Sequence, residues 1–150
     1  MNLQELLNET LITTDLREGN KFQIIQELLE LAVQAGKVRD GERALKDLIE
    51  REQYLSTGFE NGLAVPHAKS EAVTEMVLVF GLNKKGVDFD SLDGKPTHFI
   101  FLLLSPMDTS GPHIQTLALL ARNFQKPDNV VQLKNADGVQ EVVAILREFK

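Results

Sequence analysis

The strongest constraint on the fold is a short, uninterrupted apolar run from Phe99 to Leu104. A strand with apolar side chains at every position leaves no face for water, so we expect it to be buried on both sides. The run from Met76 to Leu82 has the length and composition of a second strand. These two strands predict a sheet that is covered by helices on both faces.

Several segments have the apolar spacing of helices and can supply this cover. The first is expected from Asn20 to Ala35 and is closed by Gly36, and a second follows the Asp40-Gly41 break. Further helices are expected at residues 111–124, 127–133 and 137–149, the first of them opened by Gly111-Pro112. The predicted inner faces are Phe22, Ile25, Leu28, Leu29 and Ala32; Ala44, Leu45, Leu48 and Leu55; Ile114, Leu117, Leu120, Ala121 and Phe124; and Val139, Val142, Val143 and Leu146.

Proline and turn-forming residues indicate where the other predicted elements end. A short strand from Leu63 to Val65 is ended by Pro66, because proline cannot donate to a sheet ladder. Residues 84–86 and 93–96 have the composition of surface turns. Strands that alternate with helices, in a chain of 150 residues, predict one α/β domain over residues 1–150, with a mixed central sheet sandwiched by helices.

Composition excludes several classes of function. The net charge of −6 and the pI near 5.1 disfavour nucleic acid as a partner. The absence of cysteine excludes disulfides and thiolate chemistry. There is no signal-like N-terminus and no apolar run of about 20 residues, so we expect a soluble, cytoplasmic protein without membrane insertion.

Two of the three histidines stand where side chains can reach a cleft. His67 follows the end of the short strand, and a neutral imidazole there could accept and release a phosphoryl group. His113 lies in the first turn of its predicted helix, where backbone N–H groups favour an anion. Either residue could instead be purely structural, and we expect a structural role for His98, at the entrance of a buried strand.

An arginine and a hydroxyl-rich turn could complete an anion site. Arg51 falls on an apolar helical stripe and is predicted to face inward, where a phosphoryl group or a carboxylate such as Glu52 or Glu60 could pair with it. Ser56-Thr57 could shape a phosphate site or simply form a turn. No glycine-rich nucleotide loop is present, so we expect no cofactor and a phosphoryl donor that is another molecule.

Taken together, these residues form a long ordered pattern. It consists of Arg51-Glu52, then Ser56-Thr57-Gly58, then Gly62-Leu63-Ala64-Val65-Pro66-His67. This pattern resembles the active-site signature of the fructose/mannitol type of enzyme IIA of the bacterial sugar phosphotransferase system. The segments 86–94 and 113–122 resemble the same family, so the likeness covers nearly the whole chain. Ala68 stands where many members have glycine.

The resemblance implies a function and partners. His67 would be phosphorylated, Arg51 would steady the phosphoryl charge, and His113 would be the second active-site histidine, with Ser56 and Thr57 in support. The donor would be phosphorylated HPr, the acceptor a cysteine of enzyme IIB, and the final recipient a sugar, of fructose type by a slight preference, at the membrane component enzyme IIC. Because two partners must dock in turn, we expect an apolar rim around the site, with Phe59, Val65 and Met107 as candidates.

Two other functions remain open from the sequence. A regulatory, nitrogen-type member of the same family would act by phosphorylation-dependent protein binding and would transport no sugar. A metal-dependent hydrolase could use His67, His113 and a carboxylate as ligands, although no close-set ligand pair is present and we expect no metal.

Overall fold

The computed structural model describes residues 3–17 and 19–150 and has a five-stranded mixed sheet at its centre. The strands are β1 (Ile12–Thr13), β2 (Leu63–Ala64), β3 (His67–Lys69), β4 (Val77–Val87) and β5 (Thr97–Ser105). Their order is β1-β4-β5-β2, and β3 also pairs with β5. The long pair β4–β5 is antiparallel, whereas the other pairings are parallel. The predicted α/β class with a mixed sheet is confirmed.

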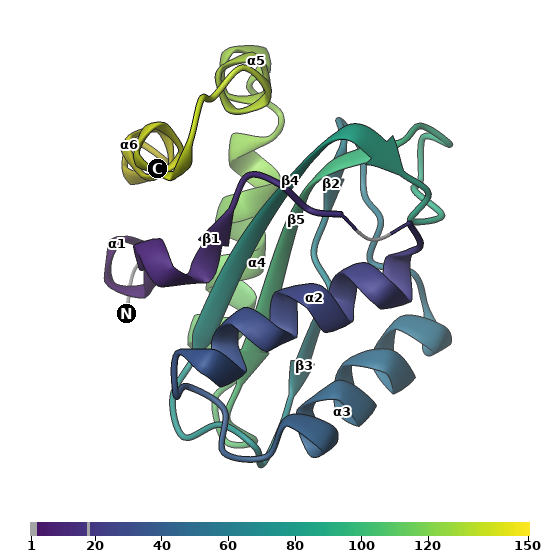
Figure 1. Ribbon diagram of the computed structural model, residues 1–150, viewed down its shortest axis with the longest axis vertical. Coiled ribbons are helices and arrows are strands. Elements are labelled where there is room, and N and C mark those ends of the chain that lie inside the picture. Colours follow the sequence, from purple (N-terminus) through teal and green to yellow (C-terminus); the bar gives the residue numbers. More distant parts are fainter. Residues whose placement is uncertain (1–2, 18) are drawn as a thin grey trace.

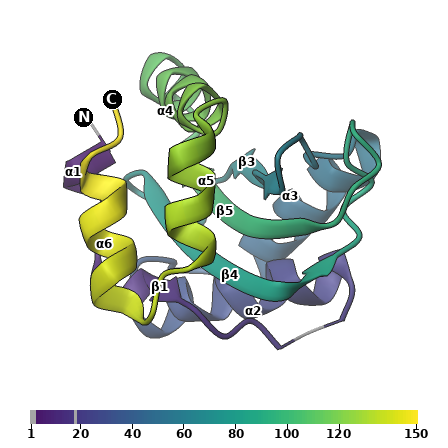
Figure 2. The same cartoon turned by 90° about the horizontal axis from the view of Figure 1, so that it is seen from above.

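Helices cover both faces of the sheet (Figures 1 and 2). On one face lie α2 (Lys21–Gln34) and α3 (Gly41–Tyr54). On the other lie α1 (Leu3–Leu6), α4 (Gly111–Asn123), α5 (Pro127–Lys134) and α6 (Val139–Arg147), and a 3₁₀ turn at Glu9–Leu11 precedes β1. The run 99–104 is buried throughout and contributes alternate side chains to the two cores, as its composition predicted.

Local signals in the sequence set the helix ends. Asn20 and Gln23 form a reciprocal capping box at the start of α2, and Asp40 caps α3 through the backbone N–H of Arg43. Pro112 occupies the first turn of α4, where a missing N–H costs nothing. The predicted helices are therefore present, with ends that differ by only a few residues.

β2 and β3 act as one strand interrupted at Pro66. Both pair in parallel with β5, with Leu63 opposite Phe99 and His67 opposite Leu103. The proline breaks the ladder, but the strand alongside continues, so pairing resumes at His67. His67 therefore begins a strand and does not merely follow one.

Three predictions about individual positions are wrong. Leu55 is extended at the C-terminal cap of α3 and is 63% exposed, because the helix ends before it can join the apolar stripe. Ile114 is 64% exposed on α4. Residues 84–86 lie within β4, whose pairing with β5 shifts register between Leu82 and Val87, and do not form a separate turn.

Candidate functional site

Two histidines from distant parts of the chain meet at one open depression. His67 begins β3 and His113 lies in the first turn of α4, and their ring centroids are 5.4 Å apart. The depression has a volume of about 520 Å³ and includes Arg51 from the last turn of α3. Its complete lining is Asp47, Glu50, Arg51, Tyr54, His67, Ala68, Lys69 and His113. Thus His67, His113 and Arg51, singled out in the sequence, lie together.

The imidazole of His67 is oriented by the backbone just before it. Its Nδ1 lies 2.6 Å from the carbonyl oxygen of Val65. A carbonyl oxygen can only accept a hydrogen bond, so Nδ1 carries the proton and Nε2 keeps its lone pair. Burial, and secondarily the positive charge of Arg51, lower the pKa of His67 despite opposing contributions from the Val65 carbonyl and Glu52. His67 is therefore a neutral imidazole near pH 7, with Nε2 available as a nucleophile.

His113 is more enclosed than His67. His113 is 6% exposed, and its Nδ1 lies 2.6 Å from the hydroxyl oxygen of Ser105. Burial, followed by the nearby His67 and Lys69, lowers the pKa of His113 to about 4. At neutral pH this ring is uncharged, so it can contribute to the site as a hydrogen-bond donor or acceptor but not as a cation.

Arg51 is half-buried at the edge of α3, not fully inward as predicted. One guanidinium nitrogen donates to the carbonyl oxygen of Leu55 at 2.7 Å. Neither carboxylate considered as its partner pairs with it: Glu52 binds Lys21, and Glu60 accepts from Gln125. Among residues 3–17 and 19–150 no carboxylate forms an ion pair with Arg51, and its side chain lines the depression.

Lys69 brings a second cation that sequence reasoning did not identify. It lies two residues beyond His67 in β3, on the same face of the strand, and lines the same depression. Its Nζ donates to the hydroxyl of Ser110, just before α4, at 2.7 Å. The sequence contained a signal for this residue, because side chains two positions apart in a strand lie on the same face. The lining thus contains two cations, Lys69 and Arg51, and two carboxylates, Asp47 and Glu50, in addition to the histidine pair.

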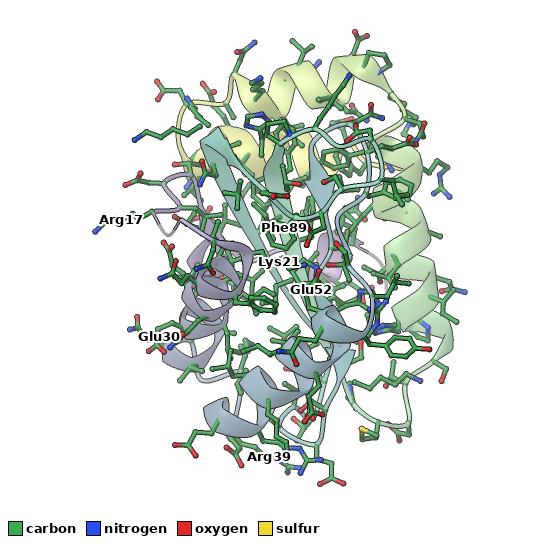
Figure 3. The ribbon with its side chains drawn as sticks, turned by 90° about the vertical axis from the view of Figure 1, so that its right-hand side faces the viewer. Arg17, Lys21, Glu30, Arg39, Glu52 and Phe89 are labelled. Carbon is green, nitrogen blue, oxygen red and sulfur yellow. The ribbon has the colours of Figure 1, made fainter. Side chains whose placement is uncertain are left out.

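Glu52 is a second residue that sequence analysis did not assign to the site. It is 2% exposed, and its carboxylate lies 3.3 Å from Nζ of Lys21, which also pairs with Asp90 at 2.8 Å. Figure 3 shows Lys21 and Glu52 close together near Phe89 inside the molecule, while Arg17, Glu30 and Arg39 lie at the periphery. The charge of Glu52 is thus compensated inside the fold, away from the open depression.

The two predicted supporting hydroxyls belong to this interior network. Thr57 donates both its backbone N–H, at 2.9 Å, and its hydroxyl to Glu52, and the Ser56 hydroxyl donates to the carbonyl of Phe89. The carbonyl of Thr57 then accepts the N–H of Val65 at 3.1 Å. Since the Val65 carbonyl orients His67, Thr57 reaches the histidine through the backbone, and neither hydroxyl lines the depression.

The predicted apolar rim is wrong. Phe59 and Val65 pack into the core under α4, and Met107, although 57% exposed, does not line the depression either. The large exposed side chain that does line it is Tyr54, at 86%. His98 lies elsewhere, and its Nδ1 donates to the carbonyl of Asn83 at 2.9 Å, which fits the structural role expected for it.

Chemically, the depression combines a free imidazole nitrogen, two cations and a neutral second imidazole. This set suits a tetrahedral anion that is bonded to nitrogen, because the cations offset its charge and the second imidazole can share a hydrogen bond with it. In the described part of the chain, no group of three or more His, Cys, Asp or Glu side chains could hold a metal ion. None of the described helices is long and apolar enough to cross a membrane.

A profile of the family described as "Phosphoenolpyruvate-dependent sugar phosphotransferase system, EIIA 2" matches residues 5–149. The chain belongs to this family, whose members are phosphotransferase phosphocarriers.

Three proteins with different names are each similar to more than nine-tenths of the chain. The fructose-specific EIIA component of Haloferax volcanii is 37% identical over 92% of this chain and 90% of its own. The structure of the nitrogen regulatory protein IIA-Ntr from Neisseria meningitidis has 30% identity and a TM-score of 0.89 over 96% of this chain and 98% of its own. The mannitol enzyme IIA of Escherichia coli, solved in complex with phosphorylated enzyme IIB, has 21% identity and a TM-score of 0.81 over 94% and 96%.

Proposed function

We propose that this chain accepts a phosphoryl group from phosphorylated HPr on Nε2 of His67 and passes it, in the cytoplasm, to a cysteine of enzyme IIB. The sugar finally phosphorylated, at a membrane enzyme IIC, is of fructose type. The observation that carries the proposal is the convergence of His67, His113 and Arg51 on one open depression, with Nε2 of His67 left free.

Each transfer exchanges one bond to phosphorus for another. In the first step the lone pair on Nε2 of His67 attacks the phosphorus of the donor phosphohistidine. The donor N–P bond breaks, and its electron pair returns to the donor imidazole. In the second step a cysteine thiolate of enzyme IIB attacks the same phosphorus, and His67 leaves as a neutral imidazole with its proton still on Nδ1.

The surrounding residues act by position and charge. Arg51 and Lys69 offset the negative charge that spreads over the transferring oxygens, and His113 donates one hydrogen bond to them. Glu52 holds Thr57, whose carbonyl accepts the N–H of Val65, and the carbonyl of Val65 in turn accepts from His67. Keeping Nδ1 protonated directs the phosphoryl group to the nitrogen that faces the partner.

The openness of the site suits two successive partners. Tyr54 at the edge of the depression is 86% exposed, and Ile114, beside His113, is 64% exposed. Exposed apolar and aromatic side chains next to a charged centre are typical of docking surfaces. Complexes that form and dissociate quickly are what a phosphate relay needs.

The proposal of a fructose-type sugar is based on the similarity to the fructose-specific EIIA component of Haloferax volcanii. A regulatory role is supported by a different similarity. The structure similar at a TM-score of 0.89 is that of a nitrogen regulatory protein. The second candidate is therefore a regulatory protein that is phosphorylated on His67 through a parallel chain and that binds other proteins according to its phosphorylation state.

The test is reconstitution with phosphoenolpyruvate, enzyme I and HPr, followed by mass spectrometry of the intact protein. We expect a gain of one phosphoryl group that is labile to acid and stable to base. His67→Ala should abolish it, and His113→Ala should slow it by about 100- to 1,000-fold. His98→Ala is the matched control, since His98 lies outside the depression, and should behave as wild type.

A second stage separates the two candidates. Adding a fructose-type enzyme IIB should remove the label from His67 and place it on a cysteine of that protein. Label that forms on His67 but is not accepted by any fructose- or mannitol-type enzyme IIB would favour the regulatory candidate. No label on the wild-type protein with a cognate HPr would overturn the phosphocarrier proposal.

A further inference from the structure

A buried serine contacts His113 on the side away from the depression. Ser105 is fully buried, and its hydroxyl oxygen lies 2.6 Å from Nδ1 of His113. Geometry alone allows either group to donate. The direction of this hydrogen bond matters, because it decides which nitrogen of His113 carries the proton.

The hydroxyl proton of Ser105 is buried and needs an acceptor, and this requirement determines the direction of the hydrogen bond. Within the described part of the chain, His113 is the one hydrogen-bond partner of the Ser105 hydroxyl. If Nδ1 donated to that oxygen, the hydroxyl proton of Ser105 would be buried without an acceptor, which is unfavourable. If Ser105 donates, its proton is satisfied and Nδ1 accepts. Ser105 is therefore the donor, and the proton of the neutral His113 ring is on Nε2.

The position of Ser105 is fixed by the same pairing that places His67. Ser105 ends β5 opposite Lys69 of β3, and its carbonyl accepts the N–H of Ser70 at 2.9 Å. Two residues earlier in the same ladder, Leu103 lies opposite His67. The hydroxyl is thus held by the sheet, while the histidine it contacts comes from α4.

We propose that Ser105 is a positioning residue, whose hydroxyl holds His113 in the Nε2–H tautomer so that the ring presents an N–H donor to the phosphoryl group on His67. The role rests on the function proposed above. Since the pKa of His113 is lowered to about 4, the ring is neutral near pH 7 and carries a single N–H. In the other tautomer a lone pair on Nε2 would face the phosphoryl oxygens and repel them.

Nitrogen NMR tests the tautomer directly. In protein labelled with ¹⁵N-histidine, long-range proton–nitrogen spectra at pH 7 distinguish a protonated ring nitrogen from an unprotonated one. We expect His113 to have protonated Nε2 and unprotonated Nδ1 in the wild type, and a mixture of tautomers in Ser105→Ala. A wild-type ring protonated on Nδ1, or a Ser105→Ala spectrum identical to that of the wild type, would overturn the inference.

A matched control removes a different buried hydroxyl from the same strand. Thr97 is fully buried at the opposite end of β5, where its hydroxyl lies 3.0 Å from that of Ser91. Thr97→Val should leave the His113 tautomer and the phosphorylation rate at wild-type values. Urea unfolding of both variants establishes that the proteins compared are folded.

Kinetics then connect the tautomer to transfer. Ser105→Ala should slow phosphorylation of His67 by roughly 10-fold, which is less than the roughly 100- to 1,000-fold cost of losing one positioned donor outright, because part of the His113 population keeps the donating tautomer. Ser105→Cys, which keeps the size of the side chain but donates weakly, should fall between wild type and Ser105→Ala. A changed tautomer with an unchanged rate would overturn the role in transfer. Failure of the wild type to accept phosphate would sink the proposed function, while the NMR result would still decide what Ser105 does.

Discussion

Glu52 accepts two hydrogen bonds from Thr57, one from the backbone N–H at 2.9 Å and one from the hydroxyl. Glu52 is 2% exposed and also pairs with Lys21. The carboxylate therefore ties the last turn of α3 to the extended segment that follows it. From Thr57 the connection continues through Val65 to the ring of His67, so a buried ion pair supports the orientation of an exposed nucleophile.

Replacing Glu52 should therefore cost both stability and activity. Glu52→Ala leaves the N–H and the hydroxyl of Thr57 without their acceptor and leaves Lys21 with Asp90 alone, so we expect it to lower the free energy of unfolding by about 2 kcal/mol. Urea denaturation measures this. Glu30→Ala removes an exposed carboxylate from α2 and should change stability by less than about 0.5 kcal/mol. Equal effects of the two substitutions would contradict the role given to Glu52.

Gly58, next to Thr57, should not tolerate even a methyl group. A Cβ there would collide with the carbonyl oxygen of Phe89 and lie 3.0 Å from Cα of Ser91. These are backbone atoms and cannot rotate away, so Gly58→Ala should lower the free energy of unfolding by about 2 kcal/mol. Gly19→Ala, where nothing lies within 4 Å, should change it by no more than about 0.5 kcal/mol. Thermal or urea unfolding of the pair checks the prediction, and wild-type stability of Gly58→Ala would refute it.

The arrangement of strands and helices could be predicted because it depends on local periodicity and capping. The apolar run at 99–104 required cover on both faces, and the spacing in α2, α4, α5 and α6 supplied it. That His67, His113 and Arg51 share one site was implied by the family resemblance, because the periodicity of their separate elements does not show which elements meet. Their roles in transfer stay predictions.

The interior of α3 shows why other features could not be predicted. Its buried positions are Ala44, Leu48 and Glu52, spaced four residues apart, and Arg51 lies beside that row. Including Leu55 in the apolar stripe rotated the expected inner face toward Arg51, but the helix ends before Leu55. An inward glutamate becomes recognisable only when Lys21 and Thr57 are seen to reach it, and these contacts span 31 and 5 residues.

His67 should titrate below the ordinary histidine pKa of about 6.5. Burial is the larger cause of its lowered pKa and Arg51 a smaller one, so Arg51→Ala should move the midpoint upward but only part of the way. Arg51→Lys keeps the positive charge and should leave the midpoint closer to that of the wild type. Proton NMR of the His67 ring across pH 4–8 measures all three midpoints. A downward shift in Arg51→Ala would contradict the electrostatic interaction assigned to Arg51.

His113 should make the folded protein less stable in mild acid. Its pKa is lowered to about 4 in the folded state, whereas in the unfolded chain it is about 6.5. Between these values the unfolded chain binds a proton that the folded chain does not, so stability is greatest above pH 6.5 and falls as the pH drops toward 4. Taken alone and unscreened, this proton would lower the free energy of unfolding by about 2 kcal/mol between pH 7 and pH 5, and water on the open side of the ring reduces this to about 1 kcal/mol.

A variant isolates this contribution from that of the carboxylates and of His67. His113→Gln removes the titrating ring but keeps a polar side chain, so groups that titrate elsewhere contribute nearly equally to both proteins. Urea unfolding at pH 7 and at pH 5 gives the loss of stability for each protein. We expect the loss to be about 1 kcal/mol smaller in His113→Gln than in the wild type. Equal losses would mean that His113 accepts its proton as readily in the folded state as in the unfolded chain, and the enclosure that makes it a neutral partner of His67 would then be refuted.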